Sequence, residues 1–119
     1  MAKILIVDDS KVFRKILHTT LEENGHTIIA EAGNGEEALS ILEKESADLV
    51  TLDITMPIMD GLDALKNIHE KYPATKIVMV SAAGQKDKVM DALKSGASDF
   101  LQKPLEPEEV IKVINRLVS

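Results

Sequence analysis

Three aspartates follow short apolar segments of this chain at places where strands would end. Asp8 and Asp9 come directly after residues 3–7, and Asp53 comes directly after residues 48–52. If these segments are neighbouring parallel strands, the three carboxylates converge at one edge of a sheet. Two like charges about 4 Å apart repel by roughly 4 kcal/mol at an effective dielectric constant near 20. Such a cluster therefore calls for a cation.

The donor set indicates which cation this would be. Oxygen ligands without a thiol or an imidazole suit Mg²⁺, which takes one or two carboxylates together with water and phosphate oxygens. Each aspartate taken alone is more simply explained as a helix cap or a turn residue. The three together favour a Mg²⁺ site formed by Asp8, Asp9 and Asp53.

A hydroxyl and an ammonium are expected at the same edge of the sheet. Ser81 follows a predicted strand at residues 76–80, and Lys103 follows another at residues 98–101. A carboxylate can attack phosphorus when a metal and a lysine neutralise the charge, and the product is an aspartyl phosphate. Alone, Ser81 is more simply a helix cap and Lys103 a surface charge. Their placement beside the acids instead predicts phosphoryl transfer to a carboxylate.

Elements of two kinds must position these side chains. β-Branched runs predict five strands, and apolar residues at helical spacing predict five helices between and after them. The first helix is expected from Ser10 onward, capping residues predict helix starts at Asn34 and Asp60, and Pro107 stands where a first helical residue is favoured. The strands are expected at residues 3–7, 27–31, 48–52, 76–80 and 98–101. The first helix carries one apolar stripe, composed of Val12, Phe13, Ile16, Leu17, Thr20 and Leu21.

Strands that are apolar on both faces and separated by helices predict an α/β fold. We expect a single doubly wound sheet of five parallel strands covered by helices on both faces. A length of 119 residues with 45% hydrophobic residues suits one domain over 1–119. A chain of this size can bury a sufficient hydrophobic core without disulfide bonds or other cross-links.

The composition excludes several classes of function. A formal net charge of −6 repels nucleic acids and anionic membranes, so neither is an expected partner. The chain has no cysteine, which excludes disulfide frameworks and cysteine-ligated metals. Its longest aliphatic runs are far too short for a membrane span or a signal peptide. We therefore expect a soluble, cytoplasmic protein.

Five short motifs along the chain, taken together in their order, resemble the receiver domain of two-component response regulators. The resemblance spans essentially the whole chain and implies a flavodoxin-like sheet with strand order 2-1-3-4-5. The segments after Asp53 and Ser81 are most similar to the stand-alone chemotaxis regulators of that family. The motifs are Val7-Asp8-Asp9-Ser10 with Arg14, residues 51–57 with Met59-Asp60-Gly61, Ser81-Ala82, residues 96–100, and Lys103-Pro104.

The resemblance implies a role for each acidic residue. Asp53 would accept a phosphoryl group from the phosphohistidine of a sensor histidine kinase. Asp8 and Asp9 would hold Mg²⁺ directly or through water, together with Asp53 and the backbone carbonyl of Thr55. The protein would not be an enzyme acting on external substrates, but a phosphoacceptor that catalyses its own phosphorylation and dephosphorylation.

The resemblance also implies a phosphoryl contact set and a switch. Ser81 and Lys103 would each bind a phosphoryl oxygen, and the Lys103-Pro104 peptide bond would be cis. On phosphorylation Ser81 would move toward the phosphate and Phe100 would turn inward, which shifts an existing equilibrium toward an active surface.

Two hypotheses remain open for how the phosphorylated protein passes on its signal. The family's usual output face is formed by the fourth helix, the fifth strand and the fifth helix, here near residues 86–95, 98–101 and from Pro107 onward. With no effector domain expected after Ser119, the protein would act by docking to a downstream protein, as in chemotaxis. Alternatively, it would pass the phosphoryl group to a histidine phosphotransfer protein.

Three other functions fit these residues less well. Gly33-Asn34-Gly35-Glu36-Glu37-Ala38, with Asp53 further on, satisfies a dinucleotide fingerprint but leaves the other acids without roles. A haloacid-dehalogenase-like phosphatase needs a second aspartate where Thr55 stands. A flavodoxin-like phosphate cradle after the first strand would be repelled by the acidic pair there.

The three histidines show no spacing typical of metal ligands. His18, His26 and His69 are therefore expected to be surface imidazoles.

Overall fold

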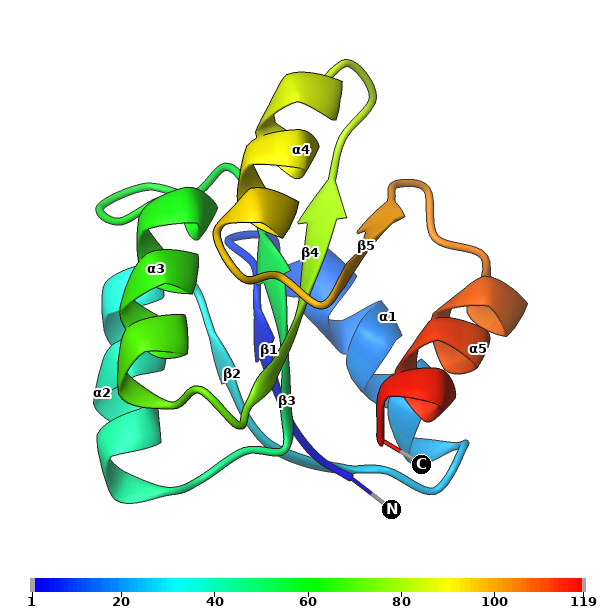
Figure 1. Ribbon diagram of the computed structural model, residues 1–119. Helices are drawn as coiled ribbons and strands as arrows, with labels where there is room; N and C mark the ends of the chain where they lie inside the picture. The colour runs from blue at the N-terminus through cyan, green and yellow to red at the C-terminus, as the bar shows by residue number, and fades with distance from the viewer. Residues whose placement is uncertain (1, 119) are drawn as a thin grey trace.

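A computed structural model describes residues 2–118 of the chain, with strands and helices in strict alternation (Figure 1). The elements are β1 (Lys3–Val7), α1 (Lys11–Glu22), β2 (Thr27–Ala32), α2 (Gly35–Lys44), β3 (Leu49–Asp53), α3 (Gly61–Lys71), β4 (Lys76–Ser81), α4 (Lys86–Lys94), β5 (Asp99–Gln102) and α5 (Pro107–Val118).

The five strands form one sheet in the order β2-β1-β3-β4-β5, and every neighbouring pair is parallel. Helices α1 and α5 cover one face, and α2, α3 and α4 cover the other (Figure 1). The predicted α/β fold, its parallel sheet and its strand order are thus confirmed.

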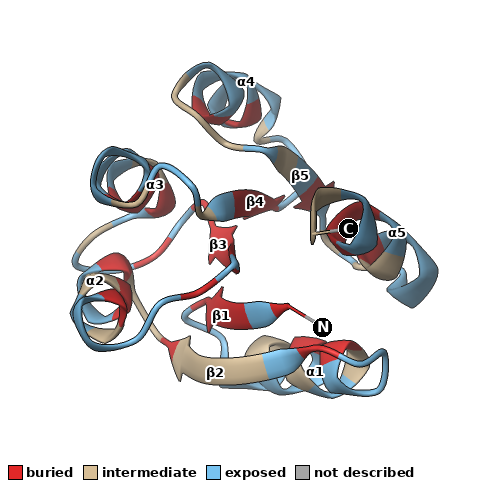
Figure 2. Cartoon of the chain, turned by 60° about the horizontal axis from the view of Figure 1, so that its bottom comes forward, coloured by how far each residue is buried: buried red, intermediate tan, exposed pale blue. Residues whose placement is uncertain are grey.

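Two apolar cores lie on opposite faces of this sheet because side chains alternate along each strand. On β1, Ile4 and Ile6 belong to the core under α1 and α5, whereas Leu5 and Val7 belong to the core under α2, α3 and α4. The central strands are almost entirely buried, while the edge strand β2 is only partly covered (Figure 2). Burial on both faces explains why the strand segments are apolar throughout.

The predicted helix caps Asn34 and Asp60 are confirmed, and Ser10 caps α1 in the same way. The side chains of Ser10, Asn34 and Asp60 accept hydrogen bonds from backbone N–H groups in the first turns of α1, α2 and α3. Ser81 lies inside β4, and α4 begins after Gln85. The reading of Ser81 as a helix cap is therefore wrong, because a four-residue loop separates its strand from the next helix.

The apolar stripe of α1 is only partly buried. Leu17 and Leu21 lie in the core, whereas Val12 is 70% and Ile16 is 60% exposed. The helix lies near the edge of the sheet, so the strands cover only part of its apolar surface.

His26 is buried, so its assignment as a surface imidazole is wrong. Its Nδ1 accepts the N–H of Ala2, which leaves the proton on Nε2 to donate to Asn115 Oδ1 at 2.9 Å. The ring thus ties the start of β1 to α5, a role that depends on residues far apart in sequence. His69 is exposed, as expected, and His18 is partly exposed.

Among residues 2–118, the helices are too short or too polar to span a lipid bilayer.

Two glycines provide a matched test of the backbone packing that supports the end of β3. A Cβ atom added at Gly61 would lie 2.0 Å from the carbonyl oxygen of Asp53, whereas one at Gly33 would meet only Arg14 Nη1 at 3.8 Å. We expect Gly61→Ala to lower the free energy of unfolding by about 1–3 kcal/mol. Gly33→Ala should change it by less than about 0.5 kcal/mol. Urea denaturation measures both, and equal midpoints for the two variants would contradict the prediction.

Candidate functional site

The ends of β1 and β3 bring Asp8 and Asp53 together. The two strands are hydrogen-bonded neighbours with Val7 opposite Leu52, so the residues that follow them lie at the same level of the sheet. Asp8 stands two positions after Ile6, and Asp53 four positions after Leu49; both apolar residues face α1 and α5. The strand period of two therefore directs both carboxylates toward that same face.

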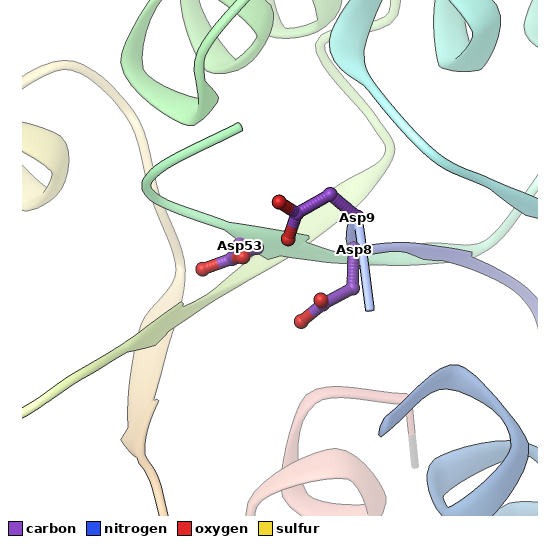
Figure 3. Close-up of side chains that lie close together, drawn as sticks. All are labelled: Asp8, Asp9 and Asp53. Atoms are coloured by element: carbon purple, nitrogen blue, oxygen red, sulfur yellow. The ribbon is translucent and has the colours of Figure 1, made fainter. Parts of the chain in front are cut away.

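Asp8, Asp9 and Asp53 form one carboxylate cluster. Each offers an oxygen that lies within 4.8 Å of those of the other two, and all three side chains project from the ends of β1 and β3 (Figure 3). Asp8 and Asp53 are buried, while Asp9 is exposed. The predicted convergence is confirmed, and the burial removes much of the water that would otherwise screen these charges.

The two carboxylate oxygens of Asp8 differ in their surroundings. Oδ1 accepts the N–H of Ser10 at 2.8 Å, which is the expected behaviour of a turn residue. Oδ2 is buried and accepts no hydrogen bond from residues 2–118, although the ammonium of Lys103 lies 3.0 Å away. The turn interpretation thus accounts for only one oxygen, and the other is available to a cation. An oxygen-only set with such an atom fits Mg²⁺.

Lys103 reaches the cluster from the end of β5. Its Nζ lies 3.0 Å from Asp8 Oδ2 and 3.8 Å from Asp53 Oδ2, so one ammonium faces both buried carboxylates. Its backbone N–H donates to the carbonyl of Ser81, and its peptide bond with Pro104 is cis, as predicted. The structure therefore places Lys103 among the acids and not on an open surface.

The environment of Asp53 shifts its acidity. Burial, followed by the negative charge of Asp8, raises the pKa of the Asp53 carboxyl to about 6. Lys103 and the N–H of Thr55 oppose this effect but do not cancel it. The positive charge of Lys103 alone thus does not neutralise the negative charge of the carboxylates at this edge of the sheet.

Ser81 and Phe100 line a common cleft. Ser81 is buried at the end of β4, beside Val80, which pairs with Asp53. Phe100 lies on β5 and is 39% exposed. A cleft of about 240 Å³ between the start of α4 and β5 has both residues in its wall.

Gln85 forms a bridge that the sequence did not indicate. Its side-chain oxygen accepts the N–H of Ala82 at 2.6 Å, and its amide nitrogen donates to the hydroxyl of Thr55 at 2.8 Å. The bridge connects the loop after β3 with the loop after β4. No local pattern marks it, because the partners are 30 residues apart.

Arg14 supports the acidic segment from α1. Its Nη1 donates to the carbonyl of Asp8 at 2.6 Å, and its Nε pairs with Glu31 at 3.0 Å. Glu31 also contacts His18. Although burial opposes their charged forms, these hydrogen bonds lower the pKa of Glu31 and raise that of His18. The network fixes the backbone that carries Asp8.

The second glycine of the dinucleotide fingerprint, Gly35, has a packing explanation. A Cβ at Gly35 would lie 2.8 Å from the Cβ of Ala64 and 3.0 Å from Met59, so this glycine allows α2 to approach α3 and the loop before it. The carboxylates and Lys103 gather instead at the ends of β1, β3 and β5.

The chain matches the family model of the response regulator receiver domain over residues 4–115. This chain belongs to the response regulator receiver domain family. It is 44% identical to the chemotaxis protein CheY of Bacillus subtilis over 98% of both chains. It is 41% identical to the chemotaxis protein CheY of Thermotoga maritima, covering 97% of this chain and 96% of the relative.

Solved structures of relatives share this receiver fold. The crystal structure of the CheX-CheY-BeF3-Mg complex from Borrelia burgdorferi contains a chain that superposes with a TM-score of 0.93 at 39% identity, over 98% of this chain and 89% of that one. Receiver domains generally bind Mg²⁺ through acidic residues, and this one carries such a cluster.

The raised pKa of Asp53 predicts a pH-dependent stability. The folded protein holds the proton more tightly than the unfolded chain, so the contribution is fully present below pH 3.8 and is lost as the pH rises through about 6. Asp53→Asn should therefore raise the free energy of unfolding by about 1–3 kcal/mol at pH 7.5 without divalent ions, and by much less at pH 4. Urea titrations at both pH values test this. An equal effect at the two would contradict it.

The acidic cluster predicts stabilisation by Mg²⁺. Millimolar Mg²⁺ should raise the melting temperature of the native chain, because a cation relieves the repulsion among the three carboxylates. Asp8→Asn and Asp9→Asn should reduce this increase strongly, whereas Asp91→Asn, exposed on α4, should leave it unchanged. Thermal denaturation with and without Mg²⁺ measures it. A full increase in both Asp8→Asn and Asp9→Asn would exclude the cluster as the binding site.

Proposed function

We propose that this receiver domain is a phosphorylation-activated response regulator whose phosphoacceptor is Asp53. The observation that carries the proposal is the meeting of Asp8, Asp9 and Asp53 with the ammonium of Lys103 at one edge of the sheet. The phosphoryl donor is a sensor histidine kinase, since receiver domains of the CheY type interact with kinases.

The reaction uses the residues of this edge as follows. A carboxylate oxygen of Asp53 attacks phosphorus, and the bond from phosphorus to the donor's imidazole nitrogen breaks, with its electron pair leaving on the imidazole. Asp8, Asp9, Asp53 and the Thr55 carbonyl would hold Mg²⁺, which supplies charge neutralisation when bound. Lys103, which lies 3.8 Å from Asp53 Oδ2, neutralises a phosphoryl oxygen. Later, water attacks phosphorus, the bond from phosphorus to the Asp53 oxygen breaks, and inorganic phosphate leaves, which restores the Asp53 carboxylate.

Ser81 and Phe100 form the switch in this proposal. The Ser81 hydroxyl donates to the phosphoryl group, and Phe100 turns into the cleft that both residues line. The cleft gives the ring a place to enter, and its present partial exposure allows it to move. Phosphorylation thereby shifts the population between two states of the surface formed by α4, β5 and α5.

That surface is the proposed docking site for a downstream protein in chemotaxis. Three large apolar side chains are exposed on α4 and β5, namely Met90, Leu93 and Phe100. CheY-like relatives support this role, and the Borrelia burgdorferi relative is seen in complex with CheX. The alternative is a phosphorelay, in which Asp53 passes its phosphoryl group to a histidine phosphotransfer protein. State-dependent binding to a target that is not itself phosphorylated supports docking, whereas exchange of phosphoryl groups with such a protein supports the relay.

Acetyl phosphate provides the direct test of the phosphoacceptor. Incubation with acetyl phosphate and Mg²⁺ should add the mass of one phosphoryl group, and chelation of Mg²⁺ should reduce the rate of its formation at least about 100-fold, since removal of one electrostatic stabiliser has such effects. Intact mass spectrometry measures the product. Asp53→Asn should abolish it, and Asp63→Asn on α3 should not. A phosphoryl adduct that persists in Asp53→Asn would overturn the assignment.

A further inference from the structure

We propose that Phe13 is a positioning residue that holds the Lys103 ammonium beside the phosphoacceptor through a cation–π contact. The Nζ atom lies 4.2 Å from the centroid of the Phe13 ring, well within the range of such contacts. The inference rests on the proposed function, because it concerns the lysine that neutralises the transferring phosphoryl group.

Two carboxylates and the Phe13 ring, each from a different element, surround the ammonium of Lys103. Asp8 follows β1, Asp53 ends β3, and Phe13 belongs to the first turn of α1. The ammonium is therefore held among three groups, of which only the ring is uncharged. The negative face of an aromatic ring attracts a cation without adding a titratable group to an edge that already carries three carboxylates.

The ring is itself firmly placed. The N–H of Phe13 donates to the side chain of Ser10 at 3.2 Å, which is the cap that begins α1. The side chain is partly buried and packs against the core formed with α5, which includes Leu17 and Val110. A support fixed by a helix cap and by the core can restrain a long and flexible lysine side chain.

The surface next to this contact provides the ammonium with few other polar or aromatic partners. A groove of about 490 Å³ runs between α1, the β4–α4 loop and the start of α5, and both Phe13 and Lys103 line it. Its other walls, within residues 2–118, are apolar apart from Thr20, and they contain no carboxylate. The ring thus provides a favourable contact for the ammonium on the side of the groove, whose other walls, among the described residues, carry no charge.

The contact becomes important because Asp8 has two competing uses. Asp8 is the nearest anion to Lys103, and it is also one of the carboxylates that fit Mg²⁺. A Mg²⁺ ion bound to Asp8 would neutralise part of its charge and so weaken the attraction between that carboxylate and the Lys103 ammonium. The contact with Phe13 does not depend on Asp8, so it can keep Lys103 near Asp53 when the first ion pair is weakened.

Fluorination of the ring separates this electrostatic role from packing. Replacing Phe13 with 4-fluoro- and then 3,4,5-trifluorophenylalanine keeps the shape of the ring but progressively removes its negative face. The second-order rate constant for phosphorylation by acetyl phosphate should fall in steps, reaching about fivefold with three fluorines, which corresponds to about 1 kcal/mol. Phe13→Trp should retain the rate, and Phe13→Leu should lose about as much as the trifluoro variant. Trifluorophenylalanine at Tyr72, at the end of α3, is the matched control and should leave the rate unchanged.

Two further measurements complete the test. Mg²⁺ affinity, measured by calorimetry, should not fall in the trifluoro variant, because the ring supports Lys103 and not the acids. In the metal-free protein, ring current should shift the Lys103 ε-methylene protons upfield in NMR spectra, and Phe13→Leu should abolish this shift.

The outcomes separate the two proposals. An unchanged rate across the fluorine series, a parallel loss of Mg²⁺ affinity, or an ε-methylene shift that persists in Phe13→Leu would each overturn the role of Phe13. Failure of the native chain to accept a phosphoryl group on Asp53 would instead overturn the proposed function, while the metal-free shift would still report whether the ring contacts the lysine.

Discussion

Electrostatic repulsion among carboxylates at the end of two paired strands is the constraint on which the other features of this site depend. Hydrogen bonding between β1 and β3 brings Asp8 and Asp53 together, and burial prevents water from screening them. Lys103 compensates only part of the negative charge, as the raised pKa of Asp53 indicates. The site is therefore suited to receive positive charge.

The rest of the fold can hold this repulsive arrangement because its two cores are independent of it. Both faces of the sheet are covered by apolar side chains from five helices, so the strands remain paired although their ends repel. Contacts from α1, from the loop after β4 and from the start of α3 then refine the geometry. Arg14 holds the carbonyl of Asp8, Gln85 links the loops after β3 and β4, and Gly61 lets α3 begin close to the backbone of Asp53.

The same arrangement connects Asp53, the proposed phosphoacceptor, to a surface. β4 leads from the core to Ser81, and its neighbour β5 carries Phe100 and is followed directly by Lys103, whose peptide bond with Pro104 is cis. In the proposed function, a change at Asp53 would reach α4 and β5 through adjacent strands. Phe13 extends this set to α1, so that elements on both sides of the central strands contact the site.

The sequence by itself determined the elements, their order and the three aspartates, since strand alternation, helix caps and the position of acids after apolar runs are local patterns. It also indicated Ser81 and Lys103, because the ends of parallel strands must share one edge. Contacts between distant residues were decided only by the tertiary structure. The bridge formed by Gln85, the ring of Phe13 over Lys103 and the buried His26 all join elements whose spacing no local pattern encodes. The exposure of Val12 and Ile16 has the same cause, because an apolar stripe predicts a helix face but not how much of it the sheet will cover.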